Sequence, residues 1–264
     1  NELNWEHAYK KEQEKMFEKF ECFGVEEGDI CEFHDLEPGT QVIRNFGVHT
    51  VKNWDSRPEW DAGYRMVGGG NAVHEKEEKG WKKIGTVIDR QRDAVESATM
   101  ESTRAFVHCQ KIRRRKVRKK DADGAYLQAP PDLERRPGGI WAEIPVCMWP
   151  KGCKAWTMRR PVFRVETSLY GLDDAGFAWD RFSHGKLEER NFHVYHDMSQ
   201  SLYDHYPENT DTNVLKNEAE ISPEDYPKDD GQLSQYVDDF MCGEDKGAGC
   251  LLYTSPSPRD YPGS

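Results

Sequence analysis

Apolar side chains recur every three or four positions in the first and third of three segments that we expect to form helices. The segments are residues 2–22, 89–110 and 174–190. Gly24 follows the first segment closely and predicts where that helix stops. Trp179 falls on the apolar stripe of the third segment, so we assign it to the hydrophobic core rather than to a binding surface.

Elsewhere the pattern of apolar and polar residues is typical of strands. Residues 39–71 contain short apolar runs separated by turn-forming residues. Residues 140–145 predict one further strand, and residues 232–241 predict a hairpin with an Asp-Asp pair near its tip. The triple glycine at residues 68–70 has no Lys-Ser/Thr after it, so it does not form a phosphate-binding loop.

The composition narrows these expectations. Hydrophobic residues make up 36% of the chain and charged residues 32%, which predicts a thin core because about 45–50% and 25% are usual. The net charge of -11 argues against nucleic-acid binding by the whole surface, so any such binding needs a local basic face. No apolar run approaches the roughly 20 residues that cross a membrane, and no signal peptide opens the chain. We therefore expect an intracellular protein, cytoplasmic or nuclear, with no membrane partner.

Two short acidic segments suggest a chemistry. They are residues 121–127, Asp-Ala-Asp-Gly-Ala-Tyr-Leu, and residues 236–239, Tyr-Val-Asp-Asp, and they stand more than a hundred residues apart. If the fold brings these carboxylates together, their oxygens can bind the two divalent cations, roughly 4 Å apart, that phosphoryl transfer requires. The alternative is that the Asp-Asp pair belongs to an ordinary turn and that Asp121 is a surface charge.

Taken in order with a third block, these segments resemble the reverse transcriptase domain of copia-type retrotransposon polyproteins. The resemblance runs from about residue 6 to about residue 244. The family's first catalytic block, Asp followed by Ala-Tyr/Phe-Leu, is matched at 121–127, and its final block, Tyr-Val-Asp-Asp, at 236–239. Its middle block, Ser/Ala-Leu-Tyr-Gly-Leu with a downstream Trp, is matched at 168–172 and Trp179.

The resemblance implies an α+β fold, with the fingers and palm of a right-hand polymerase. The palm would be an antiparallel ferredoxin-like sheet backed by helices. We expect a fingers-like region at 1–115 and a palm-like catalytic region at 116–245, within which residues 207–231 form a flexible acidic loop. Residues 246–264 read as a disordered tail that is foreign to the fold, and the thumb is expected to be absent.

The resemblance also implies where metal ions and catalysis would be located. Asp121 and Asp238 would hold two Mg²⁺ ions, for which Mn²⁺ can substitute, and Asp239 would assist them. Neighbouring side chains on an extended backbone point to opposite faces, so one residue of the Asp-Asp pair is expected to support the turn or a metal-bound water.

Four further residues are candidates for nucleotide binding. The resemblance implies that Tyr126 forms a wall beneath the incoming sugar and excludes a 2′-hydroxyl, whereas the alternative is a buried core tyrosine. Asp123 and Gly124 are assigned to the backbone turn around the triphosphate. Arg65 is a candidate for neutralising triphosphate charge, with a solvated strand arginine as the alternative.

A basic run, residues 111–120, holds eight Lys or Arg residues in ten positions. It could contact template or primer phosphates without reading sequence. The alternatives are a solvated charged loop and a patch that resembles a nuclear-import signal. The candidate nucleic-acid-binding residues are Lys111, Arg113, Arg114, Arg115, Lys116 and Arg118.

Several departures from the family pattern bear on activity. The basic run stands where the family has an apolar palm strand. The family's Lys-Gln-Ala-Pro-Arg stretch is replaced at residues 173–177 by Asp-Asp-Ala-Gly-Phe, which exchanges two positive charges for two negative ones near the expected path of the nucleic acid. Glycine replaces a second basic residue after Arg65. The chain begins at Asn1 rather than Met, and the thumb and ribonuclease H regions are missing after Glu244, so we expect a fragment of a polyprotein.

The resemblance implies a nucleotidyltransferase that adds deoxynucleotides to a primer 3′-hydroxyl. Its partners would be an RNA template, a DNA primer and deoxynucleoside triphosphates. Three alternatives stay open: a catalytically dead fragment with the same fold, a noncatalytic nucleic-acid-binding protein that uses residues 111–120, and an unrelated acidic domain that matches by chance. The sequence leaves open whether this chain is an active enzyme.

Overall fold

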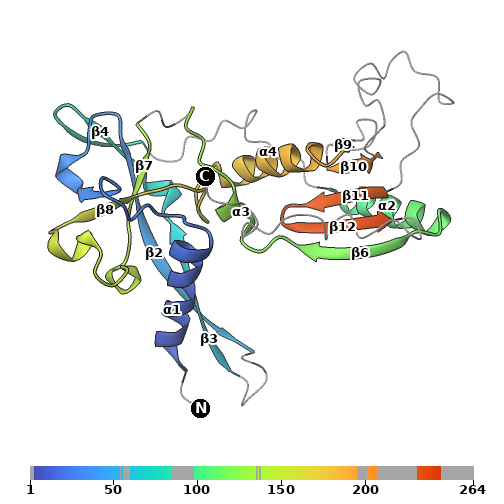
Figure 1. The fold of residues 1–264 in the computed structure, drawn as a ribbon, viewed down its shortest axis with the longest axis horizontal. Helices are drawn as coiled ribbons and strands as arrows, with labels where there is room; N and C mark the ends of the chain where they lie inside the picture. The colour runs from blue at the N-terminus through green and yellow to red at the C-terminus, as the bar shows by residue number, and fades with distance from the viewer. Residues whose placement is uncertain are drawn as a thin grey trace. The chain divides into compact units, whose positions relative to one another are not determined.

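The protein has a mixed α+β fold with two separate β-sheets (Figure 1). The fold is seen in a computed structural model, which describes residues 3–53, 55, 60–84, 98–134, 136, 138–194, 201–206 and 231–244. The predicted tail lies outside these residues, as does the predicted acidic loop except for Gly231. None of the helices in the described ranges is long and apolar enough to cross a membrane.

The chain packs into two compact units, each assembled from two stretches of sequence. The first unit contains residues 1–93 and 126–179, and the second contains residues 94–125 and 180–264. The two units are defined by which residues pack together, whereas the predicted fingers-like and palm-like regions are defined by function. The boundary at 115/116 therefore stays a prediction.

The first unit begins with the predicted amphipathic helix. Helix α1 spans Trp5–Glu14 and continues into a π-helical turn, Lys15–Lys19. Its first turn is capped by Asn4, whose side-chain oxygen accepts a hydrogen bond from the His7 backbone N–H at 2.9 Å. The prediction of a helix within residues 2–22 is confirmed.

Seven strands form the sheet of the first unit, in the order β1-β8-β7-β2-β4-β5 with β3 paired to β2. Strand β2 pairs in parallel with β7 and antiparallel with β3 and β4. The strands predicted at 39–71 and 140–145 are confirmed, although the first region begins with one continuous strand of 12 residues. The strands are β1 (Ile30–Glu32), β2 (Gln41–Lys52), β3 (Asp61–Gly68), β4 (His74–Glu77), β5 (Gly80–Lys83), β7 (Ile140–Glu143) and β8 (Pro161–Arg164). Short 3-10 turns span Phe33–Asp35, Gly70–Ala72, Val146–Met148 and Lys154–Thr157.

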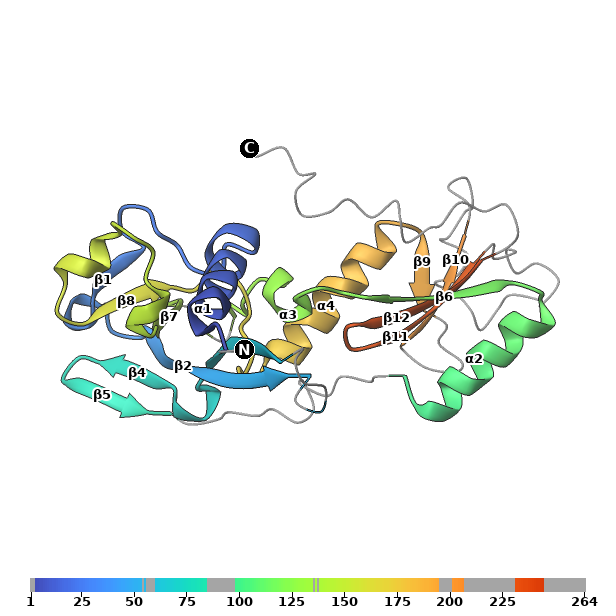
Figure 2. The ribbon, with the colours of Figure 1, turned by 90° about the horizontal axis from the view of Figure 1, so that it is seen from below.

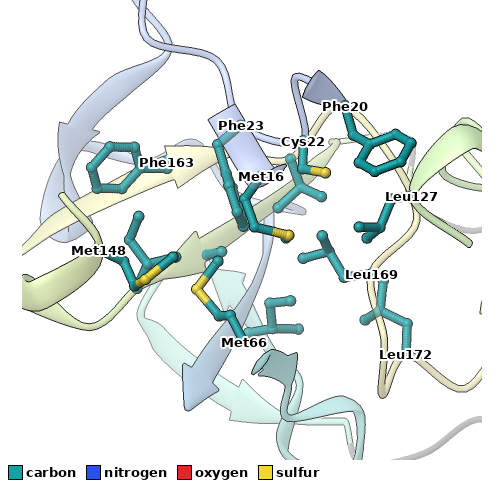
Figure 3. Packing of buried hydrophobic residues seen from close by; sticks show 14 of the residues in the cluster. Met16, Phe20, Cys22, Phe23, Met66, Leu127, Met148, Phe163, Leu169 and Leu172 are labelled. Atoms are coloured by element: carbon teal, nitrogen blue, oxygen red, sulfur yellow. The ribbon is translucent and has the colours of Figure 1, made fainter. Parts of the chain in front are cut away.

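A continuous apolar core fills the first unit (Figure 3). Met16 from the helical end of the chain, Met66 from β3 and Phe163 from β8 are all buried in it. Helix α1 also makes a polar contact with the sheet, because the Met66 backbone N–H donates to Glu12 Oε1 at 2.9 Å. That hydrogen bond gives the buried Glu12 carboxylate a partner.

The sheet of the second unit has five strands, all antiparallel, in the order β6-β12-β11-β10-β9 (Figure 2). Gly231–Tyr236 and Asp239–Glu244 form the β11–β12 hairpin, which confirms the hairpin predicted at 232–241. The other strands are β6 (Lys116–Asp121), β9 (Phe192–Val194) and β10 (Leu202–His205).

Two longer helices accompany this sheet. Helix α2 spans Met100–Ile112 and α4 spans Ala175–Glu188, while the short α3, Ala125–Gln128, follows β6. The prediction for 174–190 is confirmed. That for 89–110 is confirmed over residues 100–110, since α2 begins at Met100 after its N-cap Thr99, and residues 89–97 lie outside the described residues. Trp179 is buried, as assigned.

The two helices contact the second sheet through glutamines of β11. Gln110 Nε2 in α2 donates to Gln232 Oε1 at 2.6 Å, and Gln235 Nε2 donates to Ser183 Oγ in α4 at 2.8 Å. Residues three apart on a strand point to opposite faces, so α2 and α4 contact opposite faces of the sheet. The apolar core here is small and consists of Leu187, Phe192, Tyr203 and Leu233.

Candidate active site

The fold brings the two acidic segments of the sequence together within the second unit. Asp121 is the last residue of β6 and stands directly opposite Asp239, the first residue of β12. Side chains that face each other in this way have Cβ atoms roughly 5 Å apart. Two carboxylates more than a hundred residues apart in sequence are therefore cross-strand neighbours.

Asp238 is placed differently, in the two-residue turn between β11 and β12. Its side chain is exposed, and its backbone carbonyl accepts a hydrogen bond from the Ala122 N–H at 2.7 Å. This bond ties the hairpin turn to the end of β6. The sequence favoured Asp121 and Asp238 as the principal pair, whereas in the sheet register the residue opposite Asp121 is Asp239.

The first residue of the same turn is conformationally strained. Val237 has φ of +54°, in the left-handed region that β-branched residues avoid. Backbone strain of this kind costs of the order of 1–3 kcal/mol and clusters at functional sites. The strained Val237 lies between Tyr236 and the two candidate aspartates.

Asp121, Asp238 and Asp239 together form what we call the acidic corner, and Lys119, which was not among the predicted site residues, reaches it. Lys119 Nζ lies 2.8 Å from Asp239 Oδ2. The hydrogen bond with Asp239 and the charge of that carboxylate raise the pKa of Lys119, and the charges of Asp121 and Asp238 add to the shift. The signal was available, because Lys119 is two residues before Asp121 and so shares its face of β6.

The donor chemistry of this corner fits a hard divalent cation in part. Asp121, Asp238 and Asp239 offer carboxylate oxygens, which are the ligands that Mg²⁺ and Mn²⁺ prefer. Within the described ranges, however, no group of three or more His, Cys, Asp or Glu side chains is arranged to hold a metal ion. The backbone thus brings the acids together, while the Asp239 carboxylate is engaged with Lys119.

The predicted basic run spans a helix end, a turn and a strand. Lys111 lies in α2, Arg113 and Arg114 follow that helix, and residues 116–120 belong to β6 rather than to a loop. Strand β6 is at one edge of its sheet, and most of its side chains are exposed. Charged residues also protect an edge strand against pairing with another chain, so the exposure has a structural explanation as well.

Alternation along β6 divides its charges between two faces. Lys119 shares the face of Asp121, whereas Lys116, Arg118 and Lys120 belong to the other face. The candidate phosphate-binding residues Lys116 and Arg118 are therefore separated from the acidic corner by the strand itself. Their nucleic-acid contacts stay a prediction.

The turn predicted after β6 is present in the second unit. Asp123 and Gly124 form it, and Gly124 has φ of +66°, which glycine adopts without strain. The Asp123 side chain is exposed. That this turn surrounds a triphosphate stays a prediction.

Two other candidate nucleotide residues meet within the first unit, around Tyr170 of the middle block. The Arg65 guanidinium carbon lies 5.0 Å from the centre of the Tyr170 ring, and the Tyr126 ring centre lies 5.6 Å from it. Lys15 Nζ is 5.5 Å from the same ring. Tyr126 is half-buried rather than a fully buried core residue. Neither Tyr170 nor Lys15 was predicted from the sequence to belong to this cluster.

Glycines hold the middle block in position. The Gly68 N–H donates to the Tyr170 carbonyl at 2.6 Å, and the Gly70 N–H donates to the Gly171 carbonyl at 3.2 Å. Gly171 has φ of +91°, and a Cβ atom there would lie 2.3 Å from the Gly68 oxygen. The triple glycine, which the sequence excluded as a phosphate loop, thus packs backbone to backbone against the Ser-Leu-Tyr-Gly-Leu block.

The acidic pair that departs from the family pattern is buried in the first unit. Arg136 Nη2 lies 3.3 Å from Asp173 Oδ1 and 3.1 Å from Asp174 Oδ1, and Arg136 Nη1 also pairs with Asp174. Arg136 Nε donates to Gln41 Oε1 at 3.1 Å. Only 5% of the Arg136 side chain and 2% of the Asp174 side chain are exposed. These acids therefore pair internally, with a partner that nothing in the sequence indicated.

The structure defines the chain as an α+β protein with cross-strand carboxylates at one end of an antiparallel sheet. No family model matches the chain, and a search of the curated proteins found no match.

Proposed function

We propose that the chain is the RNA-directed DNA polymerase domain of a retrotransposon polyprotein. The observation that carries the proposal is the pairing of Asp121 with Asp239 across neighbouring strands, with Asp238 in the adjoining turn. The same three residues complete the first and last catalytic blocks of the family that the sequence resembles. In this proposal residues 116–245 form a palm-like region and residues 1–115 a fingers-like region, in an intracellular protein.

The proposed reaction joins a deoxynucleotide to a primer 3′-hydroxyl, with pyrophosphate as the leaving group. Divalent cations, Mg²⁺ or Mn²⁺, supply Lewis-acid charge for this reaction when bound. The carboxylates of Asp121, Asp238 and Asp239 would hold these cations. Most of the rate would come from alignment and charge neutralisation, because little covalent protein chemistry is needed.

The cluster around Tyr170 supports a role in binding the incoming nucleotide. Arg65 is exposed, and its guanidinium can pair with phosphate oxygens. Tyr126 lies against the same ring and would set the limit on the 2′ position of the sugar. Both side chains belong to the first unit.

Primer extension on an RNA template with Mg²⁺ tests the proposal. The wild-type chain should incorporate deoxynucleotides, while Asp121→Asn and Asp238→Ala should each lose at least about a hundredfold in rate, because each removes a metal-binding carboxylate. Glu101→Gln, an exposed acid in α2, should retain wild-type activity and serves as the matched control. Equal incorporation by Asp238→Ala and the wild type would refute catalysis at this corner.

A second candidate is a noncatalytic nucleic-acid-binding protein, which the exposed basic side chains of β6 favour. Binding of single-stranded RNA or DNA that weakens steeply with salt, without any extension, would support this candidate. No extension and no binding would instead support a catalytically dead fragment with the same fold.

A further inference from the structure

We propose that Lys119 is a built-in counter-cation of the acidic corner and competes with divalent metal ions for Asp239. The inference rests on the proposed function, because it assumes that the corner binds such ions. Lys119 Nζ lies 2.8 Å from Asp239 Oδ2, which places a positive charge on one of the expected metal ligands. A metal ion that binds Asp239 through Oδ2, or through both carboxylate oxygens, must displace this ammonium group.

The need for a cation follows from the arrangement of the carboxylates. Asp121 and Asp239 are cross-strand neighbours, and Asp238 adjoins them in the turn. Like charges held this close repel one another and destabilise the ionised pair. Lys119 offsets part of this repulsion while no metal is bound, and so favours the pairing of the hairpin with β6.

The position of Lys119 on β6 makes it specific for this task. Residues 119 and 121 share one face of the strand, and the side chain of Lys119 crosses from β6 to the first residue of β12. Lys120 carries the same charge one position nearer to Asp121, but it belongs to the opposite face and stands opposite Phe240. A comparison of variants at the two lysines therefore separates the effect of direct contact with Asp239 from the general effect of a nearby positive charge.

The ion pair is weak enough to exchange with a metal ion. The side chains of Lys119 and Asp239 are 64% and 34% exposed, so water and salt screen their attraction. An exposed ion pair changes an equilibrium constant by up to roughly fivefold. The expected influence on metal affinity is thus a few-fold and not an absolute block.

The test measures Mn²⁺ binding to the full chain by the electron paramagnetic resonance signal of free Mn²⁺, with no nucleotide or nucleic acid present. Lys119→Met should tighten Mn²⁺ binding by roughly threefold to fivefold, because the competing ammonium is removed. Lys120→Met, which removes the same charge from the other face, should change the affinity by less than about half as much. Circular dichroism of each variant checks that the sheet is retained.

Two further variants make the result decisive. In an Asp239→Asn background, Lys119→Met should bring no gain in Mn²⁺ affinity, because the contested ligand is gone. Equal gains from Lys119→Met and Lys120→Met would overturn the proposal, since they would show a general effect of charge. The proposal also falls if Lys119→Met leaves Mn²⁺ binding unchanged, or if neither protein binds Mn²⁺.

The failure of this inference can be told apart from that of the proposed function. If Lys119→Met tightens Mn²⁺ binding while the wild type never extends a primer, the counter-cation stands and the polymerase activity falls. If the wild type extends primers and Lys119→Met binds Mn²⁺ no more tightly, the activity stands and the counter-cation falls.

Discussion

The two compact units each contain a cluster of charged side chains, and the two clusters differ in burial. The first unit buries an ionic network, in which Arg136 contacts Asp173, Asp174 and Gln41 inside the protein. The second unit leaves the charges of its edge strand β6 exposed, and Lys119 pairs there in contact with solvent. A buried pair fixes structure because breaking it leaves an uncompensated charge, whereas an exposed pair exchanges readily with ions and ligands. The contrast indicates a structural role for the first set, whereas the second set is accessible to ions and ligands.

Arg136→Met gives the largest effect and tests the structural side of this contrast. The variant should lose roughly 3–5 kcal/mol in free energy of unfolding, because two buried carboxylates lose their cation. Denaturation by urea, followed through tryptophan fluorescence, measures the change. Lys10→Ala breaks an exposed pair with Glu14 and should cost less than about 0.5 kcal/mol. Similar losses for both variants would remove the distinction between buried and exposed pairs.

Gly171→Ala comes next and tests the backbone contact that positions Tyr170. The variant should lose roughly 1–3 kcal/mol, because a Cβ atom at φ of +91° is strained and would lie 2.3 Å from the Gly68 oxygen. Gly185→Ala is a control of opposite sign. Gly185 lies inside α4 with nothing within 4 Å of an added Cβ atom, so alanine should stabilise by about 0.5–1 kcal/mol. A neutral Gly171→Ala would show that the contact can relax.

The smallest effect concerns the alkaline stability of the first unit. Burial raises the pKa of Cys22 to about 12 from its ordinary value of 9.0. The unfolded chain therefore loses this proton first, and stability falls as pH rises from 9 toward 12. Between pH 9 and pH 10 the wild type should lose about 1 kcal/mol more than Cys22→Ala. Cys109→Ala, which removes an exposed thiol in α2, should follow the wild type. Parallel pH profiles for Cys22→Ala and the wild type would contradict this assignment.

Local pattern was enough to predict the three longer helices and strands β2, β3, β7, β11 and β12, but not the shorter strands β1, β4, β5, β8, β9 and β10. The spacing of apolar residues located α1, α4 and the strand region of the first unit, and the hairpin of β11 and β12 followed from a short apolar run interrupted by an Asp-Asp pair. These features depend on neighbours within a few residues, which the sequence displays directly. The basic run was harder to interpret, because eight charges in ten positions hide the alternation of a strand.

The pairings between distant segments could not be derived from local pattern. The register that places Asp239 opposite Asp121 depends on how β6 meets β12, and a shift of one residue would have brought Asp238 there instead. Asp173 and Asp174 were expected near the path of the nucleic acid, because nothing near them in sequence indicates that Arg136 is their partner. The sequence thus supplied the candidate residues, and the tertiary fold decided which of them meet.

The strand order of the second sheet has a consequence for synthesis on the ribosome. Strand β6 emerges more than a hundred residues before β12, which is its one partner strand among the described residues. Long-range strand pairing is slow because a large loop must close first, and an unpaired edge is prone to aggregate meanwhile. The eight basic residues at 111–120 keep this segment hydrated before β12 is made, and their charge opposes pairing with the same segment of a second nascent chain. A chain released before residue 239 would carry Asp121 without its partner.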